Sequence, residues 1–87
     1  MKNRKLLDEF HSLGEKVGVK IIKGKGDFSG GICTLNEEKV IVINKSKPIE
    51  QRLNILAKSF IEYDLDKFYV VPALRAYIDK ITTLNFK

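Results

Sequence analysis

The strongest constraint on this fold is an unbroken apolar stripe along residues 49–60. The stripe recurs at intervals of three and four residues, which is the spacing that places side chains on one side of a helix. Pro48 fits the first turn of that helix, where a missing N–H costs nothing, and Ser46 or Lys47 is the expected cap. A helix of this kind must bury its apolar side against other elements. The stripe consists of Ile49, Leu53, Leu56, Ala57 and Phe60.

Two further segments have helical spacing of apolar residues. The first covers residues 4–17 and ends at Gly18, which can adopt the left-handed cap conformation. The second begins at Pro72, since the residue before a proline is pushed out of the helical conformation. Its apolar side carries Leu74, Tyr77, Ile78 and Ile81. We expect the tail, residues 82–87, to fray.

Three short segments between the first two helices are predicted strands: residues 19–23, 30–35 and 40–44. Short links between them favour antiparallel pairing, because a parallel crossover needs about a dozen residues or more. The run Val40–Ile43 is apolar on both faces, which suits a central strand or one covered on its second face. We therefore predict an α+β fold in the order α-β-β-β-α-α, with a three-stranded antiparallel sheet covered by helices.

The length of the chain limits its interior. With 87 residues, the whole chain (1–87) is expected to form a single domain. A domain this small buries only about 60–65% of the surface of its unfolded chain, so a large internal cavity is not expected. Any binding site should be a shallow groove or a surface patch.

The cysteine count and the apolar runs point to a cytoplasmic protein. Cys33 is the only cysteine, so no disulfide can form within the chain, which fits a reducing compartment. The basic start, residues 1–5, is followed by Leu6-Leu7 and then at once by Asp8-Glu9, which interrupts any signal-like apolar segment. The longest apolar run, Val40–Ile43, is far short of the roughly 18–20 residues of a membrane span. We expect no association with a membrane.

Positive charge is concentrated in the first half of the chain. The net charge is +5; residues 1–47 hold ten Lys/Arg against six acids, and residues 48–87 hold six against five. A basic half is typical of domains that bind an anionic partner, such as nucleic acid or an acidic protein surface. It is also typical of lysines that only keep a small domain soluble. The composition leaves both interpretations open.

The order of a hairpin, an apolar strand and a helix led by a proline and an arginine resembles the core of the zincin-like metallopeptidases of the ImmA/IrrE type. In that family the helix carries H-E-x-x-H after a leucine or alanine, and the frame at Leu56-Ala57 puts Lys58, Ser59 and Glu62 at those positions. Zinc needs several deprotonated N, S or O ligands, and this chain has one histidine and one cysteine. The resemblance therefore implies the architecture without zinc hydrolysis, and we expect no metal site.

Other catalytic groups are also missing from the sequence. Cys33 lies in a predicted strand and reads as a small, half-buried apolar residue. His11 lies off the apolar stripe of its helix and reads as a solvated residue. The glycines of residues 23–26 and 29–31 match neither a Walker loop nor a dinucleotide-binding loop. We predict that the protein is not an enzyme and holds no cofactor.

The order α-β-β-β-α also resembles the double-stranded-RNA-binding domain, which presents lysines at the start of its second helix. Lys45, Lys47 and Arg52 flank the corresponding helix start here, where the helix dipole favours anions. The K-K-x-A-K helix start and the G-P-x-H loop of that family are absent from this chain. This resemblance implies nucleic-acid binding through the basic first half.

Several short motifs are spread over about half of the chain. They are Gly30-Gly31-Ile32-Cys33, Asn44-Lys45, Pro48 to Arg52, Leu56-Ala57, Asp64-Leu65 and Pro72 to Arg75. In these motifs the chain is similar to a group of short bacterial proteins of unassigned function, a resemblance that implies no activity. The arginines of the motifs, Arg52 and Arg75, each follow a proline into a helix and could bind an anion through two hydrogen bonds. The alternative is an internal salt bridge to Asp64 or Asp66.

These observations predict a non-catalytic domain that acts by binding. Our first hypothesis is a protein-interaction or regulatory module of a bacterial system, with Tyr63, Phe68 and Tyr69 as exposed aromatic residues of an interface. A homodimer would also compensate for the small core. The alternative hypothesis is RNA or DNA binding through the lysines of the first half.

Overall fold

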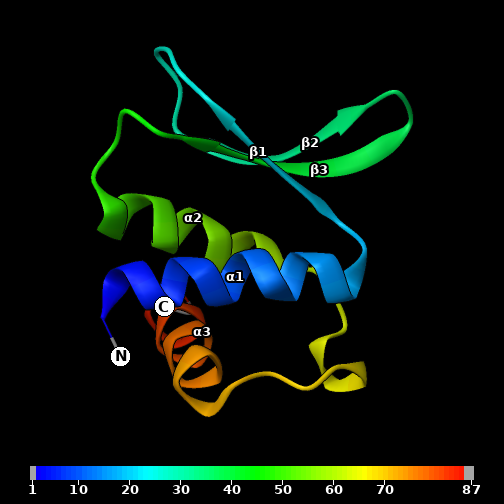
Figure 1. Ribbon diagram of the computed structural model, residues 1–87, viewed down its shortest axis with the longest axis vertical. Helices are drawn as coiled ribbons and strands as arrows, with labels where there is room; N and C mark the ends of the chain where they lie inside the picture. Colours follow the sequence, from blue (N-terminus) through cyan, green and yellow to red (C-terminus); the bar gives the residue numbers. More distant parts are fainter. Residues whose placement is uncertain (1, 86–87) are drawn as a thin grey trace.

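The computed structural model describes residues 2–85. It confirms a small, compact α+β fold and the predicted order of three helices and three strands (Figure 1). One element was not predicted, a single 3-10 turn between the last two helices. The elements are α1 (Asn3–Val17), β1 (Lys20–Gly24), β2 (Gly30–Leu35), β3 (Glu38–Asn44), α2 (Ile49–Phe60), η1 (Leu65–Lys67) and α3 (Pro72–Asn85).

The prediction of an antiparallel sheet is wrong, because the sheet is mixed. Its strand order is β1-β3-β2, with β1 parallel to β3 and β2 antiparallel to β3. The short-link argument holds for β2 and β3, which form a hairpin. It fails for β1, because β1 pairs not with the next strand but with the one after it. The connection from β1 to β3 includes the whole of β2, so it is long enough for a parallel crossover.

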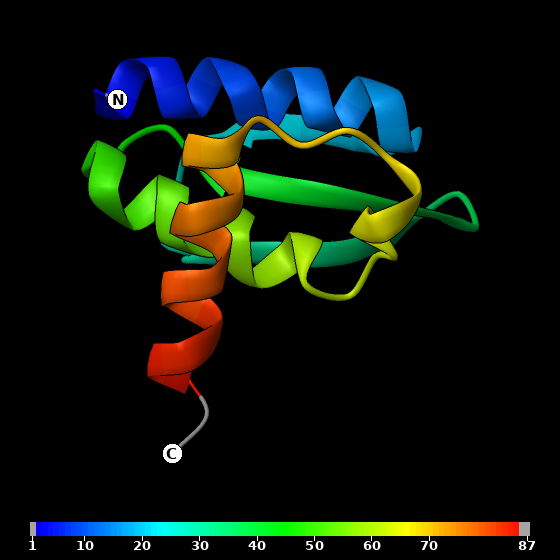
Figure 2. The same ribbon diagram turned by 90° about the horizontal axis from the view of Figure 1, so that it is seen from below.

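The helices lie on one face of the sheet. α1 packs along β1, α2 packs under β2 and β3, and α3 packs against the other two helices on the side away from the sheet (Figures 1 and 2). Ile41 and Ile43 of β3 are completely buried on this inner face. Phe10 of α1 and Phe60 of α2 stack with their ring centroids 5.7 Å apart, which joins the two helices beneath the sheet.

The C-terminal helix α3 continues through Asn85. Ile81 is buried against the core, and Thr82 donates a hydrogen bond from its hydroxyl to the carbonyl of Ile78 at 2.9 Å. Fraying of residues 82–87 stays a prediction. The last two residues of the predicted tail, 86 and 87, lie outside the described residues.

Two adjacent glycines begin β2 in conformations that other residues rarely adopt. Gly30 has φ +110° and Gly31 has φ +137°. A Cβ atom on Gly30 would lie 2.5 Å from the carbonyl oxygen of Val42 on β3, while a Cβ atom on Gly31 would meet nothing within 4 Å. The first glycine therefore permits close approach of the two strands, in addition to its unusual φ.

We expect Gly30→Ala to lower the free energy of unfolding by about 3 kcal/mol or more, because backbone strain adds to the clash with β3. Gly31→Ala is the matched control, with a cost of about 1–2 kcal/mol from strain alone. Urea denaturation of both variants measures the difference. Equal losses would show that close approach of the strands at Gly30 does not matter.

Candidate binding surfaces

The helix that resembles the metallopeptidase helix carries no metal ligands in the corresponding positions. Lys58 is exposed, and Glu62 lies beyond the end of α2. Ser59 is buried, and its hydroxyl donates to the carbonyl of Ile55 at 2.8 Å. Across residues 2–85 we find no group of three His, Cys, Asp or Glu side chains that could hold a metal ion.

Asn44, from the Asn44-Lys45 motif, is a buried structural residue. Its Nδ2 donates to the carbonyls of Gly26 and Phe28, both at 2.7 Å, and its Oδ1 accepts from the backbone N–H of Ser46 at 2.9 Å. One side chain thus fixes the loop after β1 and the turn that leads into α2. These hydrogen bonds satisfy the polar atoms of the buried Asn44 side chain, so its burial is explained without a ligand.

The basic residues at the start of α2 lie at the end of the sheet where the strands β1 and β3 both finish. β1 and β3 are parallel and end side by side, and the N–H of Lys45 donates to the carbonyl of Gly24 at 2.9 Å. Lys25 and Lys45 therefore follow the ends of two neighbouring strands at the same end of the sheet, and Lys47 comes soon after Lys45 in the chain. Lys45 is exposed and Lys47 is half-buried. The parallel pairing, which we did not predict, thus brings together lysines that are about twenty positions apart in the sequence.

The two arginines of the shared motifs have different surroundings. The Nε of Arg52 donates to the carbonyl of Lys47 at 3.2 Å, which holds the turn before α2. Arg75 forms an ion pair with Asp66 at 3.4 Å, one of the two salt-bridge partners we considered. Because the Asp66 side chain is 87% exposed, this pair stabilises the fold only slightly.

The three aromatic residues that we predicted for an interface differ in how far they are exposed to solvent. Tyr69 is 69% exposed, and the Lys16 ammonium lies 5.4 Å from the centroid of its ring. Phe68 and Tyr63 are half-buried. Tyr63 packs beside Phe60 with ring centroids 6.1 Å apart, and its hydroxyl is buried with no hydrogen-bond partner. Only Tyr69 has the exposure expected of a contact residue.

An apolar surface that no helix of residues 2–85 covers lies on the face of the sheet opposite the helices. Because Ile41 and Ile43 point to the helices, alternation along the strand turns Val40 and Val42 the other way. The register places Ile22 and Gly31 beside Val42, and Lys20 and Cys33 beside Val40. We call this surface the outer sheet face: Ile22, Gly31, Cys33, Leu35, Val40 and Val42, with Lys20 and Glu38 as its charged members.

Exposure on the outer sheet face varies from residue to residue. Leu35 is 51% exposed, and Cys33, which we expected to be half-buried, is also exposed. Ile22 and Val42 are half-buried, and Val40 is buried among its neighbours. No helix in the described part of the chain covers this face (Figure 1).

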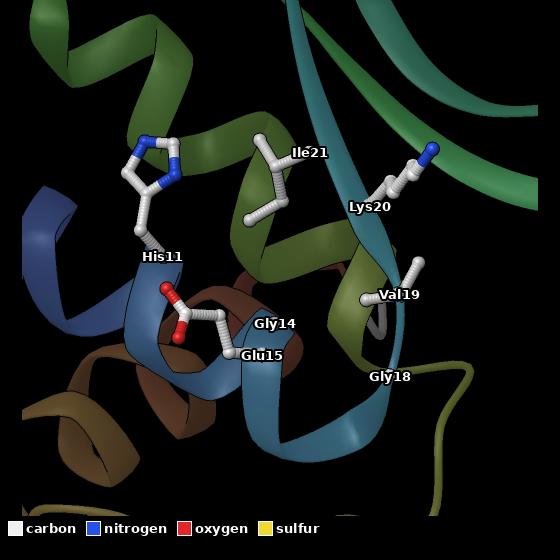
Figure 3. Close-up of a pocket in the computed structure, with 7 residues that line it drawn as sticks. All are labelled: His11, Gly14, Glu15, Gly18, Val19, Lys20 and Ile21. Atoms are coloured by element: carbon white, nitrogen blue, oxygen red, sulfur yellow. The ribbon is translucent and has the colours of Figure 1, made fainter.

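A groove runs between α1 and β1, at the side of the sheet where β1 lies; we call it the α1–β1 groove (Figure 3). It has a volume of about 440 Å³. Figure 3 shows the side chains of His11 and Glu15 rising from α1, with the side chain of Ile21 extending from β1. The lining residues are His11, Gly14, Glu15, Gly18, Val19, Lys20 and Ile21.

His11 is not the solvated residue that its position off the apolar stripe predicted. It is half-buried, and its Nε2 is buried with no hydrogen-bond partner. Burial and the nearby Lys23 ammonium lower the pKa of this imidazole, while the Asp8 and Glu15 carboxylates act in the opposite direction. The neutral ring therefore predominates at pH 7. The sequence carried no signal for this placement, because it depends on how α1 packs along β1.

Comparisons with family models, curated proteins and solved structures found no match to this chain. Among the residues that the structure describes, no helix has the length and apolar character needed to cross a membrane. The resemblances to the metallopeptidases, to the RNA-binding domain and to the short bacterial proteins remain predictions.

We predict that the pKa of His11 in the folded protein is below its unfolded value of about 6.5. The unfolded chain then binds the proton more tightly. Stability present above pH about 6.5 should therefore be lost as the pH falls toward the folded pKa. NMR titration of the ring protons measures the pKa, and urea denaturation at two pH values measures the loss. In the non-titrating control His11→Gln, this part of the pH dependence should disappear. A folded pKa at or above 6.5 would refute the prediction.

Proposed function

We propose that this protein is a non-catalytic protein-interaction module that binds through its outer sheet face, and that its partner there is a second copy of the same chain. The supporting observation is an apolar sheet face that no helix covers within residues 2–85. A sheet with one solvated face normally alternates apolar residues toward the core with polar residues outward. β3 departs from that pattern, since its run Val40–Ile43 is apolar on both sides.

The charge of the face favours a second copy as the partner. The chain has a net charge of +5, so two copies repel one another over most of their surfaces. The outer sheet face holds one basic residue, Lys20, and one acidic residue, Glu38, and is therefore neutral. A symmetric dimer places this face against itself, so apolar contact forms there without added repulsion.

The size of the face makes the dimer a weak one. Three strands about 4.8 Å apart and about five residues long make a patch of about 15 by 17 Å. Two such patches bury roughly 500 Å², less than the roughly 1,200 Å² of a stable interface. At about 25 cal/mol per Å² the gross gain is roughly 12 kcal/mol. The cost of association, about 4–15 kcal/mol, offsets most of it.

We expect the wild-type protein to form dimers as its concentration rises from about 10 µM to about 1 mM, which is the range expected of a weak interface. Sedimentation equilibrium measures this association. Leu35→Lys should weaken the dimer at least about tenfold, because a charge replaces an apolar contact in both copies. Thr34→Lys is the matched control, since Thr34 is exposed on the same strand but faces the opposite side. A wild-type protein that stays monomeric at about 1 mM, or equal effects of the two substitutions, would contradict the proposal.

A second candidate function is nucleic-acid binding, favoured by the parallel pairing of β1 with β3. This pairing gathers Lys25, Lys45 and Lys47 at the end of the sheet where β1 and β3 finish, beside the start of α2. Lysines that lie close together can contact successive phosphates of one nucleic-acid strand. The helix dipole adds a weaker attraction for anions at the same place.

If this function is correct, short labelled RNA or DNA should bind at low salt, and affinity should fall steeply as salt rises. Fluorescence anisotropy with single- and double-stranded probes measures both. The double variant Lys45→Glu with Lys47→Glu should reduce the affinity. A control of equal charge change is Lys58→Glu with Lys80→Glu, on the exposed surfaces of α2 and α3. Absence of binding at low salt would eliminate this candidate.

A further inference from the structure

The free edge of β1 presents unpaired backbone groups. β1 is an edge strand, since only β3 lies beside it. The carbonyl of Gly24 accepts a bond from the N–H of Lys45 on the β3 side. Backbone groups alternate along a strand, so those of Ile21 and Lys23 point to the opposite side. These N–H and C=O groups can pair with one more strand.

The α1–β1 groove lies along the same edge. Its volume of about 440 Å³ lies within the usual range of ligand sites, roughly 300–1,000 Å³. Gly14 keeps the groove open toward the strand, since a Cβ there would lie 3.0 Å from the Ile21 side chain. His11 is one of its lining residues, and its half-buried imidazole adds a polar group to the wall.

The charges along β1 select the kind of segment that would pair there. Lys20 and Lys23 on the strand and Lys25 just beyond it are exposed. Glu15 is the only acidic residue in the lining of the groove. The edge is thus positive, and it favours a partner that carries carboxylates. The same lysines disfavour pairing of β1 with the β1 of another copy, because like charges would then meet.

We propose that β1 accepts an extended acidic peptide segment as a fourth strand of the sheet, with one side chain of the segment in the α1–β1 groove beside His11. Backbone hydrogen bonds to Ile21 and Lys23 would supply affinity, and the groove would supply specificity. This inference goes beyond the proposed dimer, because it uses the edge of the sheet and not its outer face.

A suitable probe is a capped hexapeptide of alternating valine and aspartate, titrated into the ¹⁵N-labelled protein and followed by NMR. We expect shifts of the Ile21 and Lys23 amides and of the His11 ring protons. N-methylation of alternate peptide nitrogens should weaken binding at least about tenfold, since it removes the interstrand hydrogen bonds. The variant Lys23→Glu with Lys25→Glu should weaken it to a similar degree. The control Lys58→Glu with Lys80→Glu should not.

Several outcomes would overturn this proposal. One is equal binding of the corresponding valine and lysine peptide. Another is that shifts appear around Val42 on the outer face instead of at β1. A third is that a thymidine hexanucleotide binds the same amides more tightly than the aspartate peptide, which would assign the edge to nucleic acid. Leu35→Lys should leave peptide binding unchanged, so a failure here is distinguishable from a failure of the dimer.

Discussion

Four consecutive apolar residues in β3, Val40–Ile43, determine much of this structure. A strand with apolar side chains on both faces is most stable where both of its edges are paired and its faces are covered. The fold meets most of this requirement by placing β3 between β1 and β2 and by packing α2 beneath it. The second face is left with apolar side chains and no covering helix among the described residues. The central strand thus explains the sheet order and also the main candidate surface.

A second constraint is the connection between the end of the sheet and the start of α2. Asn44 ends β3 and uses both ends of its side-chain amide, bonding the loop after β1 with the nitrogen and the turn before α2 with the oxygen. The Arg52 side chain bonds back to the same turn. Asn44 and Arg52, which belong to motifs that we considered for binding, therefore serve to position the backbone. The exposed lysines around them are not constrained in this way.

The sequence predicted the elements better than their arrangement. The helices and strands follow from local periodicity, such as the Leu53, Leu56 and Phe60 stripe, so their existence and order are confirmed. Pairing of β1 with β3 is a property of the whole sheet, and link lengths between consecutive strands could not reveal it. The two-sided apolar run in β3 predicted a central strand or one covered on its second face. β3 is the central strand, whereas no helix of residues 2–85 covers its second face, so the outer sheet face was not predicted. The position of His11 depends on how α1 packs along β1, and nothing local in the sequence indicates it.

The position of β2 in the sequence, between the paired strands β1 and β3, has a consequence for synthesis of the chain on the ribosome. α1 and β1 emerge first, but the strand that β1 pairs with is completed only at Asn44. Until then the edge of β1 that pairs with β3 has no partner, and Phe10 of α1 must wait still longer, for Phe60 of α2. The β2–β3 hairpin and α2, by contrast, are neighbours in sequence and can associate as they appear. Within residues 2–85, the segment that is made before the others must thus wait for them before its pairing is complete.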